Sequence, residues 1–586
     1  MNILSTSGIN SLINSYKNAE QNRRISPLQS KLSRYNNLST AWSTLSSKLT
    51  SLNSVLSDLK VSTSSSIFNS RTTELSSADF FKATASKNAT PSSYTMRVNQ
   101  LAKSDLVVSN TMASSTAVSS MAGSHKIKIQ SGDYVSYAEL TLGSSETNNS
   151  IMTAISDAIN NDYAVVTSAE LDGSTSYNGN GTFKININGT ETSIDYDYSA
   201  GFTYSEVVDD LVSKITSKVS GVTAEKVTNG SNVSLKVTVN DKSQYISMET
   251  ANDTGTLLDS SHFNINVAKE KAASALATGS VFTPTSGNSK LSITAENSGY
   301  DNRLILSDAS GSALNFVGLT STLLTNRTVT TTDTDAGFMY SSTSATSNGL
   351  NSVIEFNGIS VQRNSNTIDD LVTNVTFDLT SKMESTDATV NVAVKNNTDE
   401  IKGKINDFIS KFNDAYLTIK NNYFSGKGGR GVFVGDTTAL SLMRTLQNTV
   451  ISKVSGLPDN AYSYLSQVGI TFDPSTGLTM SDSSKLEAAI QNEPAQLADL
   501  FNSDSGMAVS LYNTLDAYVG ADGSITDISS SISNNISFLN NKIDYIQTSI
   551  DKSSENLRKQ YERLQMQYAT LLSQQSFYSS LSGGMF

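Results

Sequence analysis

The stretch "YNNLSTAWSTLSSKLTSLNSVLSDL", residues 35–59, contains two apolar repeats with a spacing of seven residues. The members of the two repeats are Tyr35, Trp42, Leu49 and Leu56, and Leu38, Leu45, Leu52 and Leu59. Apolar residues at this spacing lie along one side of an α-helix and predict a helix that packs lengthwise against another helix. Most residues between them are Ser, Thr, Asn or Lys, so the helix needs a partner for this one side.

A second apolar repeat near the C-terminal end of the sequence offers such a partner. Its members are Ile536, Ile543, Ile550, Leu557, Leu564 and Leu571, with Leu539 and Ile546 beside them. At ~1.5 Å per residue this repeat extends over on the order of 50 Å. We expect the two terminal helices to pair, and we take all these residues as the candidate helix seam and oligomer interface. The alternative is that each helix packs on the core of its own domain.

The composition of the seam helices bears on their stability. Ser, Thr and Asn are mediocre helix formers, so we expect the pair to be marginal in a single subunit. We therefore expect the terminal helices to be loose in the free subunit and to become ordered when neighbouring subunits supply more apolar surface.

The middle of the sequence changes to an alternation of apolar and polar residues. Segments such as "SYTMRVNQL", "TFKININGTETSIDYDY" and "NSVIEFNGISVQR" alternate in this way and are separated by Gly, Asn and Ser turns, which predicts half-buried strands. A loose repeat of strand, strand and short helix starts at His125 and again at Thr182, 57 residues later. This pattern predicts stacked β-rich modules.

Helical spacing returns from about residue 397. Ile401, Ile405 and Phe408 recur at helical intervals, Asp436 is placed as the N-cap of a further helix, and Pro494 separates two short helices. The predicted fold is a multidomain α+β protein with long coiled-coil-like terminal helices, a helical leg domain and β-rich head modules inserted in the middle. The predicted domains are 1–42 with 530–586 (terminal helices), 43–72 with 397–529 (leg), 73–112 with 275–396 (head) and 113–274 (outer head modules).

Composition narrows the functional classes. The 586 residues carry a net charge of −12, are 37% apolar and only 16% charged, and are rich in Ser, Thr and Asn, which fits an exposed extracellular protein. Lys and Arg are scattered, so we expect no nucleic-acid partner. We expect no membrane span either, because no apolar run reaches roughly 18 residues. The N-terminal sequence lacks the pattern of an ordinary secretory signal.

No group of residues predicts catalysis, a cofactor or a metal site. There is no Cys, and the two His residues stand in no recognisable catalytic setting; His125 lies at the edge of a predicted strand and is expected at the surface. Asp333 and Asp335 before Gly337 resemble the opening of a calcium loop, but no acidic residue stands at the closing position. We expect an exposed turn there, and no enzyme.

Three stretches resemble the family of flagellar filament cap proteins, also called hook-associated protein 2. They are "ADFFKATASKNATPSSYTMRVNQLAKS" (78–104), "EFNGISVQRNSNTIDDLVTNVTFDL" (355–379) and "YLSQVGITFDPSTGLTMSDSSKLEAAIQNEPAQLADLF" (464–501). The sequence departs from the family pattern at Leu497, where Val is more usual, and at Ser92 or Ser93 and Asn374, where Gly is common. Residues 110–275 match nothing in particular, so the resemblance says nothing about a ligand there.

The resemblance implies a secreted, structural protein at the distal tip of the bacterial flagellum. Such a protein forms an oligomeric cap, expected to be a pentamer, that prevents loss of exported flagellin and promotes its folding and polymerisation. The implied partners are further copies of the chain, flagellin and the filament tip, the flagellar type III export apparatus and an export chaperone that binds near the C-terminus. A chain without Cys or a cleaved signal suits that export route. The alternatives are another axial flagellar protein (a hook-associated protein or flagellin) and a surface adhesin that binds host glycans.

Overall fold

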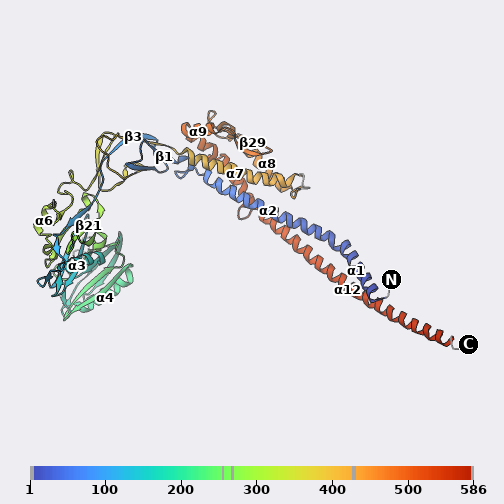
Figure 1. The fold of residues 1–586 in the computed structure, drawn as a ribbon, viewed down its shortest axis with the longest axis horizontal. Coiled ribbons are helices and arrows are strands. Elements are labelled where there is room, and N and C mark those ends of the chain that lie inside the picture. Colours follow the sequence, from blue (N-terminus) through green and yellow to red (C-terminus); the bar gives the residue numbers. More distant parts are fainter. Residues whose placement is uncertain (1–4, 254–255, 266–268, 425–430, 583–586) are drawn as a thin grey trace. The chain divides into compact units, whose positions relative to one another are not determined.

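The computed structural model describes residues 5–253, 256–265, 269–424 and 431–582, and the chain divides into two compact units (Figure 1). The helical unit comprises Met1–Thr72, Ala85–Pro91 and Val394–Phe586. The β-rich unit comprises Thr73–Thr84 and Ser92–Ala393. The chain therefore starts and finishes in the helical unit, and the β-rich unit is inserted between.

The helical unit is built from long helices and one small hairpin. Its elements are α1 Thr6–Glu20, the π-helical turn η1 Gln21–Ile25, α2 Ser26–Leu59, η2 Ile67–Asn69, α7 Thr398–Tyr423, α8 Thr437–Ile451, η5 Leu465–Val468, β29 Ile470–Asp473, β30 Gly477–Met480, α9 Ser483–Asn492, α10 Pro494–Asn502, α11 Met507–Val519 and α12 Ser524–Ser582. Within the described residues, no helix is long and apolar enough to cross a membrane.

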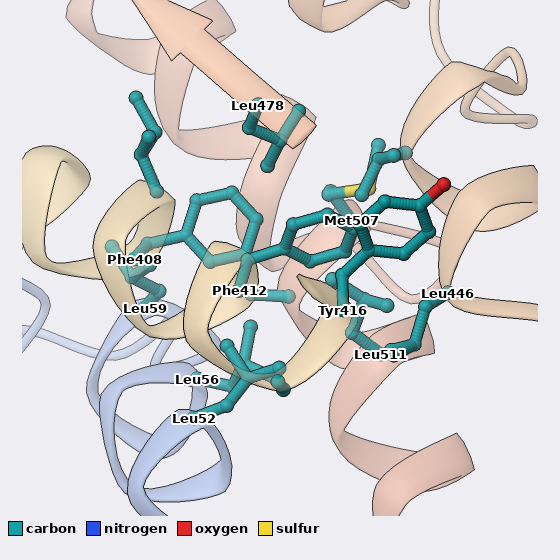
Figure 2. Close-up of a cluster of buried hydrophobic side chains, with 14 of the residues drawn as sticks. Leu52, Leu56, Leu59, Phe408, Phe412, Tyr416, Leu446, Leu478, Met507 and Leu511 are labelled. Atoms are coloured by element: carbon teal, nitrogen blue, oxygen red, sulfur yellow. The ribbon is translucent and has the colours of Figure 1, made fainter. Parts of the chain in front are cut away.

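The core of the helical unit lies where α2 meets α7 and α11. The apolar side of α2 from Trp42 to Leu59 is fully buried, together with side chains of α7, α8, β30 and α11. Figure 2 shows Leu52, Leu56 and Leu59 of α2 facing the aromatic rings of α7. Of the two alternatives for this helix, packing on a domain core is therefore the one that the structure shows for its second half.

The ends of the helices in this unit follow from local sequence. The side chain of Asp436 accepts hydrogen bonds from the backbone N–H of Thr438 and Ala439, both at 3.0 Å, which confirms the predicted N-cap of α8. Pro494 begins α10 and separates it from α9, as predicted. Proline fits the first turn of a helix because its missing N–H would have no partner there.

The β-rich unit contains several sheets. The first has the order β1 Arg71–Leu75, β28 Val390–Asn396, β3 Ser92–Gln100, β24 Ser352–Phe356 and β25 Ile359–Arg363, and a second joins β2 Phe81–Ala85, β27 Val375–Leu379 and β26 Thr367–Val372. A third has the order β20 Ala277–Phe282, β21 Asn288–Ser298, β4 Ser104–Val108 and β23 Gly337–Phe338, with β5 Met112–Ala113 on β21.

Two further sheets carry the middle of the sequence. A seven-stranded sheet has the order β14 Thr190–Asp197, β13 Asn180–Ile187, β18 Tyr245–Asp253, β19 Glu270–Lys271, β8 Tyr134–Leu142, β7 Gly123–Ser131 and β22 Ile305–Ser310. The other joins β10 Val165–Thr167, β17 Asn232–Val239, β11 Leu171–Asp172 and β16 Val222–Asn229. The ribbons β12 Ser176–Tyr177 with β15 Phe202–Thr203 and β6 Ala117–Val118 with β9 Glu146–Thr147 complete the strands. The helices are α3 Asn148–Asn161, α4 Tyr204–Lys218, α5 Ala313–Phe316 and α6 Ser321–Asn326, with short turns η3 Ala273–Ala275 and η4 Tyr300–Asn302.

The predicted repeat of strand, strand and helix is confirmed. It consists of β7, β8 and α3, and then of β13, β14 and α4, whose first strands begin 57 residues apart. Each helix starts with a threonine cap: Thr147 N donates to Ser150 Oγ at 2.7 Å, and Thr203 N donates to Glu206 Oε2 at 2.9 Å. Both form capping boxes, which fix the start of each helix after its hairpin.

The two repeats belong to different hydrophobic cores. The inner module, which we define by its core, combines residues 107–159 with 273–338, because β22 pairs with β7 and α3 packs on β20 and β21. The outer module has a core formed by residues 164–265 alone. The predicted outer division at 113–274 differs from this grouping, since the inner core extends across both of its boundaries.

Candidate assembly surface

The two terminal helices run antiparallel and are joined by polar contacts. These contacts are Arg558 Nη1 to Asn10 Oδ1 at 2.8 Å, Lys17 Nζ to Asp551 Oδ1 at 2.9 Å and Gln21 Nε2 to Gln547 Oε1 at 3.2 Å. Each step of seven or four residues forward along α1 is matched by an equal step backward along α12. One register therefore holds from Asn10 to Gln21.

Apolar side chains fill the space between these polar pairs. In α1, which contacts α12, Ile9 and Ile13 are 3% and 1% exposed. Further along, Ile25 forms a small core with Ile546 and Ile550. The pairing of α1 and η1 with α12 is therefore a coiled-coil-like contact with a narrow apolar centre.

A π-helical turn joins α1 to α2. Gln21–Ile25 forms this turn directly before Pro27, which stands in the first turn of α2. Proline lacks an N–H and its ring would clash with the carbonyl four residues earlier in a regular α-helix. A wider turn at this place lets the helix continue past Pro27, and it is a recognised cause of a bend.

The expected pairing of the terminal helices holds for part of each seam. α2 packs against α12, with Tyr35, Leu38 and Ile536 on one core, while α1 and η1 occupy the side of α12 from Gln547 to Arg558. The rest of the α2 seam lies in the core of the helical unit, where Phe408 and Phe412 of α7 offer a wider apolar surface than a single seam does.

The structure sorts the candidate seam residues into three groups by burial. Buried within their own chain are Trp42, Leu45, Leu49, Leu52, Leu56, Leu59, Leu539, Ile546 and Ile550. Partly buried against these cores are Tyr35, Leu38, Ile536 and Ile543. Leu557 is half-buried, and Leu564 and Leu571 are 51% and 62% exposed. The first group is covered inside one chain, and of the candidate seam residues only the last keep an open apolar side; the assignment of the seam to an oligomer interface stays a prediction.

The last part of α12 extends past α1 (Figure 1). α1 begins at Thr6, and the register places residues near 562 opposite its first turn. From there to residue 580, which we call the distal segment, large apolar side chains are between 44% and 71% exposed. They are Leu564, Met566, Tyr568, Leu571, Leu572, Phe577 and Tyr578. Leu564, Tyr568, Leu571, Leu572 and Tyr578 share one side of the helix and form an exposed apolar stripe, whereas Met566 and Phe577 lie on the opposite side. An exposed stripe of this kind marks an interaction surface.

Sequence reasoning missed part of this stripe, although the signal was present. The spacing of seven that links Leu564 to Leu571 continues to Tyr578. In addition, the sequence from Leu564 to Phe586 contains no Asp, Glu, Lys or Arg. An uncharged helix with a regular apolar stripe has no like-charge repulsion to keep identical copies apart.

The other candidate residues are built into the β-rich unit. His125 was expected at the surface, which is wrong: it is 7% exposed, its Nε2 lies 2.8 Å from Met121 O, and its Nδ1 accepts from Ser312 N at 3.1 Å. In the loop that resembles a calcium site, Lys290 Nζ donates to the carbonyl oxygens of Asp333 and Asp335 at 2.7 and 3.3 Å. A buried ammonium group of the chain itself thus occupies the cation position.

No cluster of three or more His, Cys, Asp or Glu residues suited to a metal ion occurs in the described part of the chain. The three stretches that carry the family resemblance lie on regular elements. Residues 78–104 contain β2 and β3, residues 355–379 contain β25, β26 and β27, and residues 464–501 contain β29, β30, α9 and most of α10. None of these stretches includes the distal segment.

Comparison with known proteins gives matches at both ends of the chain. The model of the flagellar hook-associated protein 2 N-terminus matches residues 5–105, and that of the C-terminus of the same family matches residues 349–571. The hook-associated protein 2 of Salmonella typhimurium is 26% identical over 199 residues, which cover 31% of this chain and 40% of the relative. That of Escherichia coli O157:H7 is 23% identical over 281 residues, which cover 44% of this chain and 54% of the relative.

The chain thus matches about half, or less, of the length of these relatives. Among solved structures, the D1-D2-D3 domains of the flagellar cap protein FliD from Escherichia coli align with 84% of this chain and 99% of that chain, at 18% identity and a TM-score of 0.46. The two family models occur in order and together cover more than half of the residues. The chain belongs to the flagellar hook-associated protein 2 family.

Proposed function

We propose that this chain caps the bacterial flagellar filament. Several copies assemble at the distal tip, keep exported flagellin from escaping, and leave a space in which each new flagellin folds and joins the filament. The observation that carries the proposal is the distal segment of α12, an exposed, uncharged apolar stripe at the end of an antiparallel helix pair in a chain of this family. The mechanism is steric and uses no bond-making chemistry.

The energetics of the distal segment favour assembly. A single helix of about 20 residues without tertiary contacts is marginal in water. Burying its seven large apolar side chains against a partner gains on the order of 10–20 kcal/mol before the costs of ordering and association. We therefore restrict the expectation of loose terminal helices to the distal segment. The seam of α2 is buried within the chain and is expected to be ordered in the free subunit.

The finer features of the proposed function concern copy number and partners. We infer a pentameric cap, secretion through the flagellar export apparatus, and an export chaperone that covers the distal segment before assembly. A chaperone on this stripe would keep the copies apart inside the cell, because the same side chains would serve both contacts. Binding of host glycans by the outer module stays a prediction, to be tested on the separate module with a glycan array.

The proposal is tested in a motile strain whose own copy of the gene is removed. The triple variant Leu564→Ser, Leu571→Ser, Tyr578→Ser changes only exposed residues of the stripe. We expect the variant to be exported and folded, as judged by circular dichroism of the purified chain, but to release flagellin into the medium and to leave short filaments without a visible cap in electron micrographs.

The matched control changes Ser573, Ser576 and Ser580, which are exposed positions of the same segment on the side of the helix away from the stripe, to Ala. This control is expected to restore normal filaments. Normal filament length and flagellin retention with the triple variant would show that the stripe is not the assembly surface.

A further inference from the structure

A strand of two residues connects the inner and outer modules. Glu270 of β19 pairs with Ile246 of β18 in the outer module and with Val135 of β8 in the inner module. In the described residues, the seven-stranded sheet passes from one module to the other through β19. A connection this short is supported by few backbone hydrogen bonds, so nearby side chains decide how firmly it holds.

Two carboxylates lie at this connection, one on each linking segment. Glu270 is 8% exposed, and its Oε1 accepts from Val165 N, at the start of the outer module, at 3.3 Å. Asp162 leads out of the inner module, and its Oδ2 accepts from Ser136 Oγ at 2.8 Å and from Ala273 N at 3.0 Å. Each carboxylate therefore holds the segment that crosses between the modules.

The surroundings of Glu270 carry an excess of negative charge. A cavity of about 1230 Å³ opens beside the connection and is lined by residues of both modules. The charged groups that act on Glu270 are Asp162, Glu139 and Lys126, and the ammonium of Lys126 is already paired with Glu139 at 2.7 Å. The cavity wall also carries charged groups that lie further along it: Asp157, Glu170 and Lys236.

These surroundings favour a neutral carboxyl group. Burial, followed by the negative charge of Asp162, raises the pKa of Glu270 to about 8, and burial raises the pKa of Asp162 as well. Glu270 therefore retains a proton at neutral pH and loses it in mildly alkaline medium.

We propose that the proton on Glu270, beside Asp162, is a latch that fixes the outer module to the inner module. With the proton present, the two linking segments lie together without charge repulsion. When the proton leaves, two negative charges face each other in a poorly solvated junction, and the modules separate about β19. The outer module is thus held rigidly at neutral pH and moves more freely in alkaline medium.

The test measures the distance between the modules in the full-length chain. Because the sequence contains no Cys, Thr141→Cys on β8 and Thr228→Cys on β16 give two unique labelling sites, both at exposed positions. Spin labels at these sites are expected to give a narrow distance distribution at pH 6.5 and a broader, longer one at pH 9.0. Glu270→Gln, which imitates the protonated form, is expected to keep the narrow distribution at both pH values.

Two further variants make the outcome decisive. Asp162→Asn removes one of the two charges but keeps an acceptor oxygen, so the shift of the distribution between pH 6.5 and pH 9.0 should disappear in this variant, whereas loss of a merely structural contact would broaden the distribution at both pH values. Glu191→Gln, an exposed carboxylate paired with Lys184 in the outer module, should behave as the unaltered chain. A distribution that does not change with pH in the unaltered chain, or that broadens equally in Glu270→Gln, overturns the proposal. If Glu270→Gln does not fold, the presence or absence of the shift in Asp162→Asn decides.

Discussion

Asn10 and Arg558 share a hydrogen bond of 2.8 Å although 548 positions of the sequence separate them. The contact fixes the register of α1 on α12, and the same register governs which apolar residues are covered and which stay open. Up to Arg558, α12 has a partner in its own chain. Past the first residue of α1, α12 continues as the distal segment. The start of α1 therefore determines where the surface that we propose for assembly begins.

The pairing of α1 with α12 depends on few side chains, which makes it sensitive to a single substitution. Ile13→Ala removes a side chain that is 1% exposed and should destabilise the pairing by about 2–5 kcal/mol. The neighbouring substitution Leu12→Ala, at a residue 36% exposed, should change it by less than about 0.5 kcal/mol. Amide hydrogen exchange of residues 6–20 measures both. Equal protection of α1 in the two variants would contradict the register.

The single tryptophan of the chain reports on the helical unit. Trp42 is fully buried, its ring centroid lies 5.1 Å from that of Phe433, and its Nε1 has no acceptor among the described residues. Trp42→Ala should cost about 3–5 kcal/mol. Trp42→Phe should cost clearly less, because it keeps an aromatic ring beside Phe433 and removes a buried N–H that has no partner. Unfolding of the two variants, followed by circular dichroism, measures which of them is less stable. Equal free energies of unfolding for Trp42→Phe and Trp42→Ala would refute this prediction.

A buried ion pair stabilises the inner module. The guanidinium of Arg327 is bonded to Asp105, and it also donates from Nη1 to the carbonyl oxygen of Leu304 at 2.5 Å. Arg327→Met leaves the Asp105 charge buried without its partner and should cost about 3–5 kcal/mol. Lys184→Met breaks an exposed pair with Glu191 and should cost no more than about 1 kcal/mol. Calorimetry of the two variants should show a large fall in melting temperature for Arg327→Met alone.

The stability of the β-rich unit should depend on pH through Glu270. Burial raises the pKa of Glu270 from its ordinary value of 4.5 to about 8 in the folded chain. Between these values the folded chain holds a proton that the unfolded chain has released, so the free energy of unfolding falls as the pH rises from 4.5 through 8 and then levels off. Glu270→Gln lacks this contribution.

The measurement is the melting temperature of both chains between pH 5 and pH 9. The temperature of the unaltered chain should fall relative to that of Glu270→Gln as the pH rises, and Glu191→Gln should follow the unaltered chain. Parallel profiles for the unaltered chain and Glu270→Gln would show that Glu270 titrates normally.

The sequence was enough to predict whether most segments form helices or strands. It did not predict which elements pack against each other. A seven-residue spacing identifies the apolar side of a helix, as it did for Trp42 to Leu59, and says nothing about what covers it. The covering residues Phe408 and Phe412 come from a segment more than 340 positions later, and its amphipathic pattern fits many partners equally well. The C-terminal seam has the same ambiguity, because α12 packs against α1 as well as α2.

Two sites in the β-rich unit differ in what the sequence could predict. At His125 a pattern that predicts burial was present but overlooked, and at Glu270 no such pattern exists. His125 is two residues before Ile127, and Ile129 follows at the same interval, so strand alternation places all three on the buried side. This signal was available. For Glu270 there was none, since a strand of two residues has no periodicity and its neighbour Asp162 lies on a distant segment. Functionally important contacts between distant segments depend on topology, which the pattern of one segment does not encode.

The antiparallel pairing of the terminal helices also has a consequence for the timing of folding. The residues that α1 needs, from Gln547 to Arg558, follow it more than 520 positions later in the sequence. At ~5–20 residues per second, a ribosome takes on the order of a minute to reach them. During that time the first helix of every nascent chain has no complement of its own, and the hairpin can close only after these residues have been synthesised.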